Sequence, residues 1–557
     1  MVRKHRQSVR QAPDLQQPNR ADNGLWWAAP AILLILVLAG SLPAARFPFV
    51  DWDDGPNVLQ NPWLNPPTLR GLATFWKEPY YGVYAPVTRT VWFLLAWISG
   101  SVPDPHVYHA ANAVIHALNA LLAYALIQRV VKDVRAAFLG SLFFAFHPLQ
   151  AEAVSWVTGM KDLLGAFFSL CALLAYMRFA EPGMNARRRG LWYFAAAAAY
   201  ILALLAKPAA ASVPLMAWVL AVTLAGQSAR QASVALTPWL LPLLPVALVT
   251  ASAEKANSLV PYTPWASRPV VAADALAFYL SKLVWPLDLC MDYGRTPRSL
   301  LAWPWRGATF AAPAALAAAA WFARRRVPVV TAASGLFVAA LLPVLGIVPF
   351  AYQAYSTTAD RYAYLAMLGP AMVFAWFLKS RHHRWPVMLA AAILLVFGAL
   401  FCLQAQTWRS SRALFAHALQ VNPSSSIANN NMGVIEMTEG RYDAALRRFE
   451  RALQTAPEYP EAHYNLGLLY ARLGRTSAAE AEFRAVLRFK PDYVMAYNDL
   501  GVLLLEQGRL EEARGCFLKA LQLQPNAALF QNNLSIVLQR MAEQKMRAPS
   551  RALGGRR

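Results

Sequence analysis

Three carboxylates lie within four residues of the chain, in the stretch "FPFVDWDDGPN" (47–57). Asp51, Asp53 and Asp54 follow the first long apolar segment, with aromatic residues interleaved. A carboxylate at such a place can act as a general base toward a hydroxyl group. Two alternatives stay open from these residues alone. Asp51 and Asp53 are spaced as hard oxygen ligands for Mg²⁺ or Mn²⁺, or the stretch is a solvated loop.

Further ionisable side chains are found at the edges of later apolar segments, where such groups point to a functional site. A lysine or an arginine at the bilayer edge can hold a phosphate whose lipid tail stays in the membrane, and arginine can grip it with two hydrogen bonds. Cations that stabilise a phosphate leaving group make glycosyl transfer from a lipid-phosphate sugar feasible. The set consists of His109, His147, Glu152, Lys161, Asp162, Lys207, Lys282, Asp360 and Arg361.

Lys207 and Arg361 are our candidate phosphate contacts, although two cations that snorkel to the interface would leave the same pattern. Lys161 and Asp162 are neighbours in the sequence and form an internal ion pair in an alternative interpretation. His147 is followed by proline, so it can simply cap the end of a helix.

The elements that position these residues are predicted from composition. The chain has 557 residues, of which 57% are hydrophobic and 15% charged, with a mean hydropathy of +0.32. A soluble protein carries about a quarter charged residues, and runs of about 20 apolar residues are the length that crosses a bilayer. The net charge of +22 arises from clusters between apolar runs, which indicates topology signals and not nucleic-acid binding. Four scattered cysteines form no metal or disulfide pattern.

Placing the basic clusters in the cytoplasm predicts eleven spans between residues 26 and 405. Two other apolar stretches, 88–101 and 272–288, then cannot cross and must lie at the outer surface or re-enter the membrane. The basic tail 1–25 is cytoplasmic in this scheme, and the loop 46–106 with its acids is external. The predicted spans are 26–45, 107–129, 136–150, 163–180, 190–206, 208–226, 235–252, 306–323, 328–349, 360–378 and 386–405.

After Trp408 the sequence becomes amphipathic and repeats every 34 residues, as Gly433, Gly467 and Gly501 show. Alanine, phenylalanine and proline recur at the same interval, which is typical of tetratricopeptide (TPR) repeats. Such arrays form α-solenoids that bind other proteins. We expect an external array over 406–541, with units near 426–459, 460–493 and 494–527, a capping helix at 528–541 and a basic disordered tail at 542–557.

One polar position of the array recurs with the same period. Side-chain amides on the first helix of each unit can bond the backbone of an extended peptide regardless of its sequence. The alternative is that asparagine stands there for local reasons. The candidate peptide-binding ladder is Asn431, Asn465, Asp499 and Asn533.

Seven motifs occur in order along the chain: "FVDWDDGPNVLQNP", "YAPVTRTVWFLLAWISG", "HVYHAANAVIHALNALLAY", "FHPLQAEAVSWVTGMKDLLGAFF", "LLAKPAAASVPL", "FYLSKLVWPLDL" and "ADRYAYLAMLG". Together they resemble the transmembrane-and-tetratricopeptide (TMTC-like) O-mannosyltransferases and their bacterial relatives, of the GT-C fold, over about 26–541. The resemblance implies that the acid pair of the first external loop, Asp53 and Asp54, is catalytic. It also implies a polyprenyl- or dolichyl-phosphate sugar as donor substrate. We expect Asp53 as the base, with Asp54 orienting the acceptor or sharing the role.

The sequence departs from the family before Pro86, where relatives often have a basic or bulky polar residue and this chain has Ala85. Arg89 is a candidate substitute as a phosphate contact. No cofactor is expected beyond the lipid-phosphate sugar, and the need for a divalent cation stays open.

The expected protein is all-α: a GT-C-like membrane domain followed by a TPR α-solenoid. The expected function is transfer of a mannose-like sugar to an acceptor hydroxyl, on a Ser or Thr of a protein held by the array. The alternatives are a non-catalytic membrane-anchored TPR scaffold and a transporter of lipid-linked sugars. The Ala- and Arg-rich composition suggests a bacterial inner membrane with the array in the periplasm.

Overall fold

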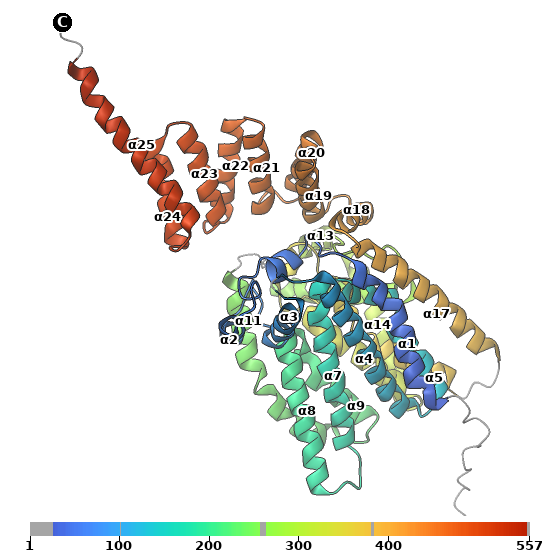
Figure 1. The fold of residues 1–557 in the computed structure, drawn as a ribbon. Helices are drawn as coiled ribbons and strands as arrows, with labels where there is room; N and C mark the ends of the chain where they lie inside the picture. Colours follow the sequence, from blue (N-terminus) through green and yellow to red (C-terminus); the bar gives the residue numbers. More distant parts are fainter. Residues whose placement is uncertain (1–25, 101, 257–262, 380–383, 554–557) are drawn as a thin grey trace, which may run out of the picture.

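The computed structural model describes residues 26–100, 102–256, 263–379 and 384–553, and the predicted cytoplasmic tail 1–25 lies outside them. Every regular element within the described residues is helical, which confirms the all-α fold. An apolar N-terminal part stands below a solenoid of helix pairs in Figure 1. The α-helices of the N-terminal part are α1 (Ala29–Ser41), α2 (Leu69–Lys77), α3 (Pro86–Ser99), α4 (Pro105–Val131), α5 (Val134–Phe146), α6 (Ala151–Ser155), α7 (Met160–Phe179), α8 (Ala186–Ala206), α9 (Val213–Thr223), α10 (Ala229–Leu236), α11 (Leu243–Ala256), α12 (Arg268–Val284), α13 (Pro297–Ala302), α14 (Ala311–Ala323), α15 (Pro328–Leu341), α16 (Leu368–Leu378) and α17 (Arg384–Ala405).

Within the described residues, five helices are long and apolar enough to cross a membrane, and the pair α10–α11, bent by 49°, brings the number to six if it forms one span. The chain is therefore a membrane protein with several apolar helices. Other predicted spans contain shorter helices, so the count of eleven stays a prediction. The long segments are Ala29–Arg46, Pro105–Val131, Val157–Phe179, Ala186–Ala206 and Trp385–Trp408.

Proline explains one of the short helices. Helix α5 ends at Phe146, because His147 precedes Pro148 and adopts an extended backbone with φ −62° and ψ 133°. A residue before proline is disfavoured in the α-helical region. The chain therefore leaves the helix here and re-forms as α6 and α7. This break brings Glu152, Trp156 and Lys161 to one end of the helix bundle.

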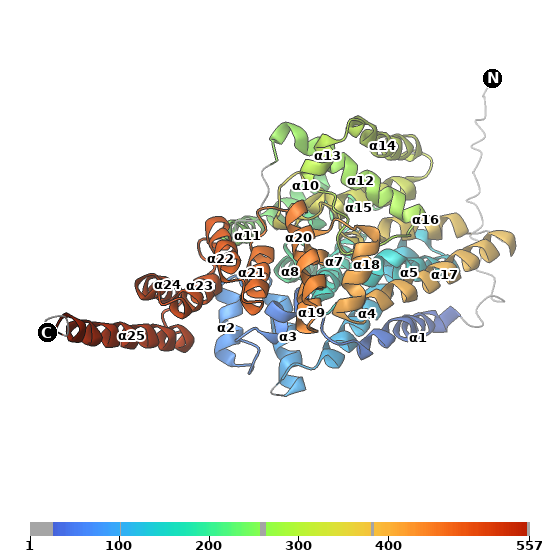
Figure 2. The same cartoon turned by 90° about the horizontal axis from the view of Figure 1, so that it is seen from above.

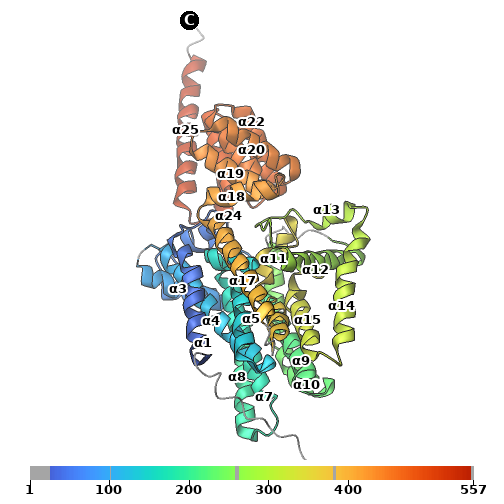
Figure 3. The same ribbon diagram turned by 90° about the vertical axis from the view of Figure 1, so that its right-hand side faces the viewer.

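The two apolar stretches that were predicted not to cross form α3 and α12. Figure 3 shows α12 running across the direction of α14 and α15. Helix α3 is tied to the end of α8, because the Thr88 hydroxyl donates a 2.9 Å hydrogen bond to the carbonyl of Ala206. The turn between α7 and α8, which precedes the arginines at the start of α8, lies at the end of the domain away from the solenoid (Figure 1).

The solenoid begins with α18, and three helix pairs and a last helix follow. Its first helices lie over the membrane part, while α24 and α25 extend past its edge (Figure 2). Helix α25 runs past the predicted boundary at 541 and into the predicted disordered tail, because "MAEQKM" (541–546) consists of strong helix formers. The helices are α18 (Ser411–Val421), α19 (Ser426–Thr438), α20 (Tyr442–Thr455), α21 (Pro460–Arg472), α22 (Thr476–Phe489), α23 (Val494–Glu506), α24 (Leu510–Leu523) and α25 (Ala528–Leu553).

The period of 34 residues has a direct packing explanation. In the first unit, a Cβ atom on Gly433 would lie 2.7 Å from the ring of Phe449. Gly467 and Gly501 meet the equivalent phenylalanine rings of their own units at 2.8 Å. Only glycine lets the two helices of each unit approach this closely. The 34-residue spacing therefore arises because the same glycine–phenylalanine contact is made in each unit.

The array is fixed to the membrane part through an apolar core that both contribute. The membrane side supplies residues such as Phe47, Val50 and Trp156, and the array supplies Trp408 and Phe415 among others. The rings of Trp156 and Trp408 stack at 5.6 Å. Since these residues are buried, the loop that carries the acids and the first array helices form one packed unit.

Candidate functional site

A cavity of about 740 Å³ joins a polar end to an apolar end. Its polar end is lined by Asp53, Lys161, Asp162, Lys207 and Arg361, which come from four separate segments of the chain. The apolar end lies between α11 and the segment after α15. It is lined by Leu243, Val246, Ala247, Ala251, Leu342, Val344, Ile347 and Val348.

Arg361 is held in place by a buried carboxylate. Its backbone N–H donates to Glu152 Oε2 at 3.0 Å, and its guanidinium donates to Glu152 Oε1. Aromatic rings surround the same guanidinium, with the centroids of Tyr352, Tyr362 and Trp156 at 4.4, 4.9 and 5.4 Å. Glu152 lies behind the cavity wall, so it positions the cation while Arg361 faces the cavity.

Lys207 follows the end of α8 and pairs with Asp162 on α7. Lys207 lies so close to α7 that a Cβ atom built on Gly165 would be 3.0 Å from the Cβ atom of Lys207. The ammonium also lies 5.4 Å from the ring centroid of Tyr362. An ammonium has three donors, so the pair with Asp162 leaves it able to bind an anion. Lys161 does not pair with its neighbour Asp162 in the described contacts but lies over Trp156 at 5.7 Å.

The two adjacent acids have different surroundings. Asp53 lines the cavity. Its carbonyl accepts hydrogen bonds from the backbone N–H and the side-chain amide of Asn57, at 3.1 and 2.9 Å, which fixes its backbone. Asp54 is fully buried and does not line the cavity.

The Asp54 carboxylate instead connects two loops. Oδ2 accepts the N–H of Val50 at 3.0 Å, and Oδ1 accepts the N–H and the hydroxyl of Thr158 at 3.3 and 3.2 Å. Burial raises the pKa of Asp54 to about 7, with the neighbouring Asp53 adding to the effect and these hydrogen bonds opposing it. The arrangement makes Asp54 a positioning residue for the loop that carries Asp53.

Asp51 points to the array. Its N–H donates to the Ser411 hydroxyl, which in turn donates to Asp51 Oδ2, both at 2.9 Å. Asp51 thus links the acidic loop to the first turn of α18. Within the described ranges no group of three or more His, Cys, Asp or Glu side chains is placed to hold a metal ion.

Arg89 does not line the cavity, although Ala85, four residues earlier in the sequence, does. The guanidinium of Arg89 donates to the carbonyl of Tyr80 and lies 5.4 Å from the Tyr80 ring centroid. Burial lowers the pKa of Arg89 to about 10. Its observed contacts hold the loop that ends at Ala85 and do not present a cation to the cavity.

Four other predicted site residues lie outside the cavity. Asp360 accepts a 2.6 Å hydrogen bond from the Tyr293 hydroxyl, and Lys282 donates to a nearby carbonyl in the α12–α13 connection. His147 Nδ1 accepts the N–H of Leu149 at 3.3 Å, which is the helix-capping alternative. His109 is buried with its ring edge-on to Phe47, at 6.2 Å between centroids.

The ladder residues of the array are half-buried, and three of the four bond to a neighbouring repeat. Asn465 Nδ2 donates to Asn430 Oδ1 at 2.9 Å, and Asn533 Nδ2 donates to Asn498 Oδ1 at 2.8 Å. Asp499 accepts a 2.6 Å hydrogen bond from Tyr464, and Asn431 accepts a weak one from its neighbour at 3.4 Å. These bonds align the side chains along the array, and peptide binding there stays a prediction.

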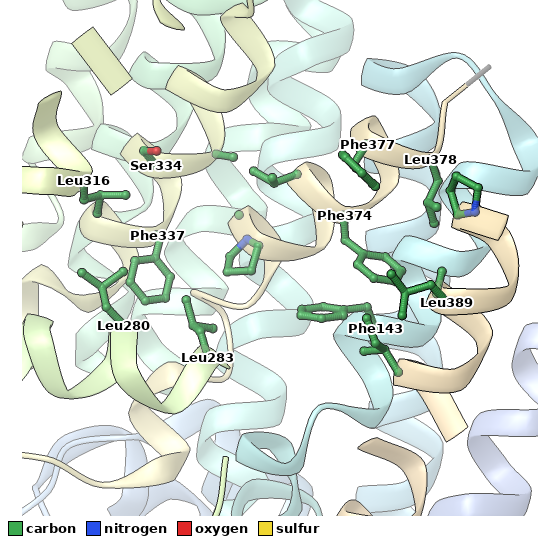
Figure 4. Close-up of a pocket in the computed structure, with 17 residues that line it drawn as sticks. Phe143, Leu280, Leu283, Leu316, Ser334, Phe337, Phe374, Phe377, Leu378 and Leu389 are labelled. Carbon is green, nitrogen blue, oxygen red and sulfur yellow. The ribbon is translucent and has the colours of Figure 1, made fainter. Parts of the chain in front are cut away.

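A second cavity, of about 460 Å³, has a different character. It lies among α5, α12, α15, α16 and α17, and Figure 4 shows leucine and phenylalanine side chains around it, with Ser334 as the labelled polar residue. No ionisable side chain of the described chain lines it. The candidate charged residues therefore line the first cavity and not this one.

Sequence reasoning missed the uncharged partners of the site. Trp156, Tyr352 and Tyr362 surround Arg361, and Thr158 binds Asp54. Trp156 and Thr158 lie inside the quoted motif "SWVTGMKD", where their closeness to charged residues was visible. Nothing in the local sequence distinguishes Tyr352, because its role depends on a contact across the fold.

The fold and the cavity define a polytopic helical membrane protein with a TPR solenoid. The tetratricopeptide repeat family matches residues 403–460, 431–494 and 464–528, which confirms the array. Curated relatives are "Protein O-mannosyl-transferase TMTC3" of Mus musculus, 29% identical over 160 residues, and "Protein O-mannosyl-transferase TMTC1" of Homo sapiens, 31% identical over 141 residues. These matches cover 27% and 24% of this chain but only 17% and 16% of the relatives.

A longer match is to "Protein O-mannosyl-transferase TMTC4" of Mus musculus, which is 24% identical over 477 residues and covers 72% of this chain and 62% of that protein. The chain is thus a TMTC-like relative at modest identity, as its motifs indicated. Among solved structures, "First TPR of Spaghetti (RPAP3) bound to HSP90 peptide SRMEEVD" is 25% identical over 21% of this chain and 93% of that chain, with a TM-score of 0.21.

Proposed function

We propose that this protein is a GT-C type glycosyltransferase that moves a mannose-like sugar from a polyprenyl phosphate to an acceptor hydroxyl. The observation that carries the proposal is the single cavity with an acid and cations at one end and aliphatic side chains at the other. A lipid-phosphate sugar has the matching chemistry, with a charged phosphate between a sugar and a long hydrocarbon tail. The relatives that are named O-mannosyltransferases support the same class.

Three groups at the polar end have roles in the proposed reaction. Asp53 takes the proton of the acceptor hydroxyl as its oxygen forms a bond to the anomeric carbon of the sugar. The bond between that carbon and the phosphate oxygen breaks, and the polyprenyl phosphate leaves with the electron pair. Arg361 and Lys207 stabilise the negative charge that develops on the phosphate. The aliphatic end of the cavity holds the first part of the lipid tail.

The proposed topology puts this reaction at the external face of the membrane, with the tail 1–25 in the cytoplasm. The array and the acidic loop must share one side, because they are packed together through Asp51, Ser411 and the shared apolar core. The arginines at the start of α8 lie at the opposite end of the domain (Figure 1), where the positive-inside rule places the cytoplasm. We further propose that the array holds the acceptor protein.

The test uses the full chain in lipid nanodiscs with radiolabelled polyprenyl-phosphate mannose and a Ser/Thr-rich peptide. Wild type is expected to label the peptide, and Asp53→Asn is expected to bind the donor without transferring the sugar. A parallel reaction with EDTA decides whether a divalent cation is needed. Donor binding without transfer in wild type would mean a different sugar or acceptor. No binding of any lipid-phosphate sugar would refute the proposal in favour of a scaffold.

A further inference from the structure

A strained tyrosine, Tyr81, directly precedes Gly82, which lines the cavity. Tyr80 and Val83 exchange two backbone hydrogen bonds of 3.1 Å, and the two residues between them have positive φ angles, 47° at Tyr81 and 71° at Gly82. A two-residue turn of this kind favours Asn-Gly or Asp-Gly, because bulky side chains are disfavoured at positive φ. Tyr81 is nevertheless 57% exposed, so burial in the core does not compensate for the strain. Such outliers are typical of functional positions.

The turn is held rigidly beside the cavity. The Tyr80 hydroxyl donates to the carbonyl of Pro56 at 3.2 Å, and the Arg89 guanidinium binds the carbonyl of Tyr80. Gly82 and Val83 line the cavity together with Asp53. Tyr81 therefore projects from a fixed support next to the candidate base.

The second repeat unit of the array approaches the same place. Tyr459, the residue before α21, packs edge-on against Tyr355 of the membrane part, with 6.2 Å between ring centroids. Partial burial raises the pKa of Tyr81 to about 12, and the carboxylates of Asp53 and Glu461 add to the effect. Trp52, the residue before Asp53, and Tyr459 of the array pack against the same apolar core, so the array reaches the loop that carries the candidate base.

We propose that Tyr81 contacts the acceptor: an extended polypeptide segment, held by the array, lies across its exposed ring while a Ser or Thr hydroxyl reaches Asp53. This inference rests on the proposed function. An aromatic ring on a rigid turn offers a flat, amphipathic surface at a small loss of conformational entropy. The aligned polar ladder of the array favours a polypeptide over a small acceptor, because it offers side-chain hydrogen bonds at regular intervals to a repeating backbone.

Tyr81→Asn separates this role from folding. Asparagine tolerates positive φ, so a tyrosine with a purely structural role at the turn could be replaced without loss. The variant and a matched Tyr81→Phe control, which keeps the ring, are compared with wild type as full chains in nanodiscs. The measurements are the KM for a Ser/Thr-rich peptide, hydrolysis of radiolabelled polyprenyl-phosphate mannose without peptide, and the unfolding temperature.

The asparagine variant is expected to raise the peptide KM about tenfold, the effect of losing one important contact residue. Its donor hydrolysis and unfolding temperature should match wild type, because water needs no contact with Tyr81. The phenylalanine control should match wild type throughout. An unchanged peptide KM in Tyr81→Asn would overturn the inference, and so would an equal fall in donor hydrolysis, which would move Tyr81 to the donor side.

A binding assay keeps the inference testable if the proposed function fails. The affinity of a fluorescein-labelled, unstructured Ser/Thr-rich peptide is measured by anisotropy for the same three proteins. If wild type binds no lipid-phosphate sugar, the proposed function is refuted, but weaker peptide binding by Tyr81→Asn would still support the contact. Equal peptide affinity in wild type and Tyr81→Asn, or no peptide binding by wild type, would overturn it.

Discussion

Replacing the two adjacent acids by asparagine is expected to damage the protein in two different ways. In Asp54→Asn, the amide has one acceptor oxygen where the carboxylate has two. The side chain of Asp54 accepts the N–H groups of both Val50 and Thr158 through different oxygens, so either orientation of the amide leaves one of these N–H groups without an acceptor. Both residues are buried, and an unpaired buried donor costs about 1–3 kcal/mol of stability.

Asp53→Asn leaves those bonds intact, since only the backbone carbonyl of Asp53 is used by its neighbour Asn57. We expect its free energy of unfolding to change by less than about 0.5 kcal/mol. Sugar transfer is expected to fall by about 10²–10⁴-fold, the usual contribution of a general base. Asp54→Asn should instead unfold at a lower temperature and keep transfer well above that of Asp53→Asn.

The assay pairs thermal unfolding of the detergent-solubilised full chain with transfer from radiolabelled polyprenyl-phosphate mannose at a temperature where both variants are folded. Normalising the rate to the folded fraction removes the stability effect. If Asp54→Asn unfolds at the same temperature as wild type and yet loses as much sugar transfer as Asp53→Asn, the assignment of Asp54 as a positioning residue is wrong. It would then belong to the reaction itself.

Three further predictions follow from contacts in the structure. Lys207→Met should weaken binding of radiolabelled polyprenyl phosphate about 10–100-fold, which is the contribution of one charge-assisted hydrogen bond. The control Lys282→Met, at a residue outside the cavity, should bind with the affinity of wild type. If both variants bind with equal affinity, Lys207 is not part of the site. The pKa of Asp54 is about 7 in the folded state against an ordinary 3.8, so the folded state holds an extra proton between these pH values. The free energy of unfolding should therefore fall as the pH rises from 4 to 7. Chemical denaturation at several pH values should show this fall in wild type and not in Asp54→Asn. Gly467→Ala should destabilise the array by about 1–3 kcal/mol, because the added Cβ would lie 2.8 Å from the ring of Phe483. In the control Gly515→Ala the added Cβ meets nothing within 4 Å, so thermal unfolding should show unchanged or higher stability.

The parts of the fold that follow from periodicity were predictable from the sequence. The repeat spacing of Gly433, Gly467 and Gly501 reports a contact made within each unit, so sequence and structure carry the same information there. The long apolar segments likewise give helices wherever proline does not interrupt them. Short helices such as α5 show the limit, because hydropathy does not reveal where His147 and Pro148 end the regular structure.

The site was predictable in its charges and not in its geometry. Asp53, Lys207 and Arg361 were predicted from the sequence as site residues, and all three line one cavity. Asp53 was predicted as the base, but Asp54 was placed at the acceptor or in the same role, because nothing in the local sequence shows that Thr158 binds the Asp54 carboxylate. The neutral aromatic partners of Arg361 also escaped, because tyrosine and tryptophan are common at membrane edges for other reasons.

The stacked pair Trp156–Trp408 limits how this protein can be divided or recombined. One side chain of the pair lies beside Arg361 and Lys161, and the other stands at the start of the array. A chain cut near residue 405 would expose Trp156, which lines the charged cavity, to solvent, so the sequence boundary between the two parts is not a place where they can be separated. Exchange of modules is compatible with this architecture only further along, from α22 onward, beyond Tyr459, where the apolar core is formed by array residues.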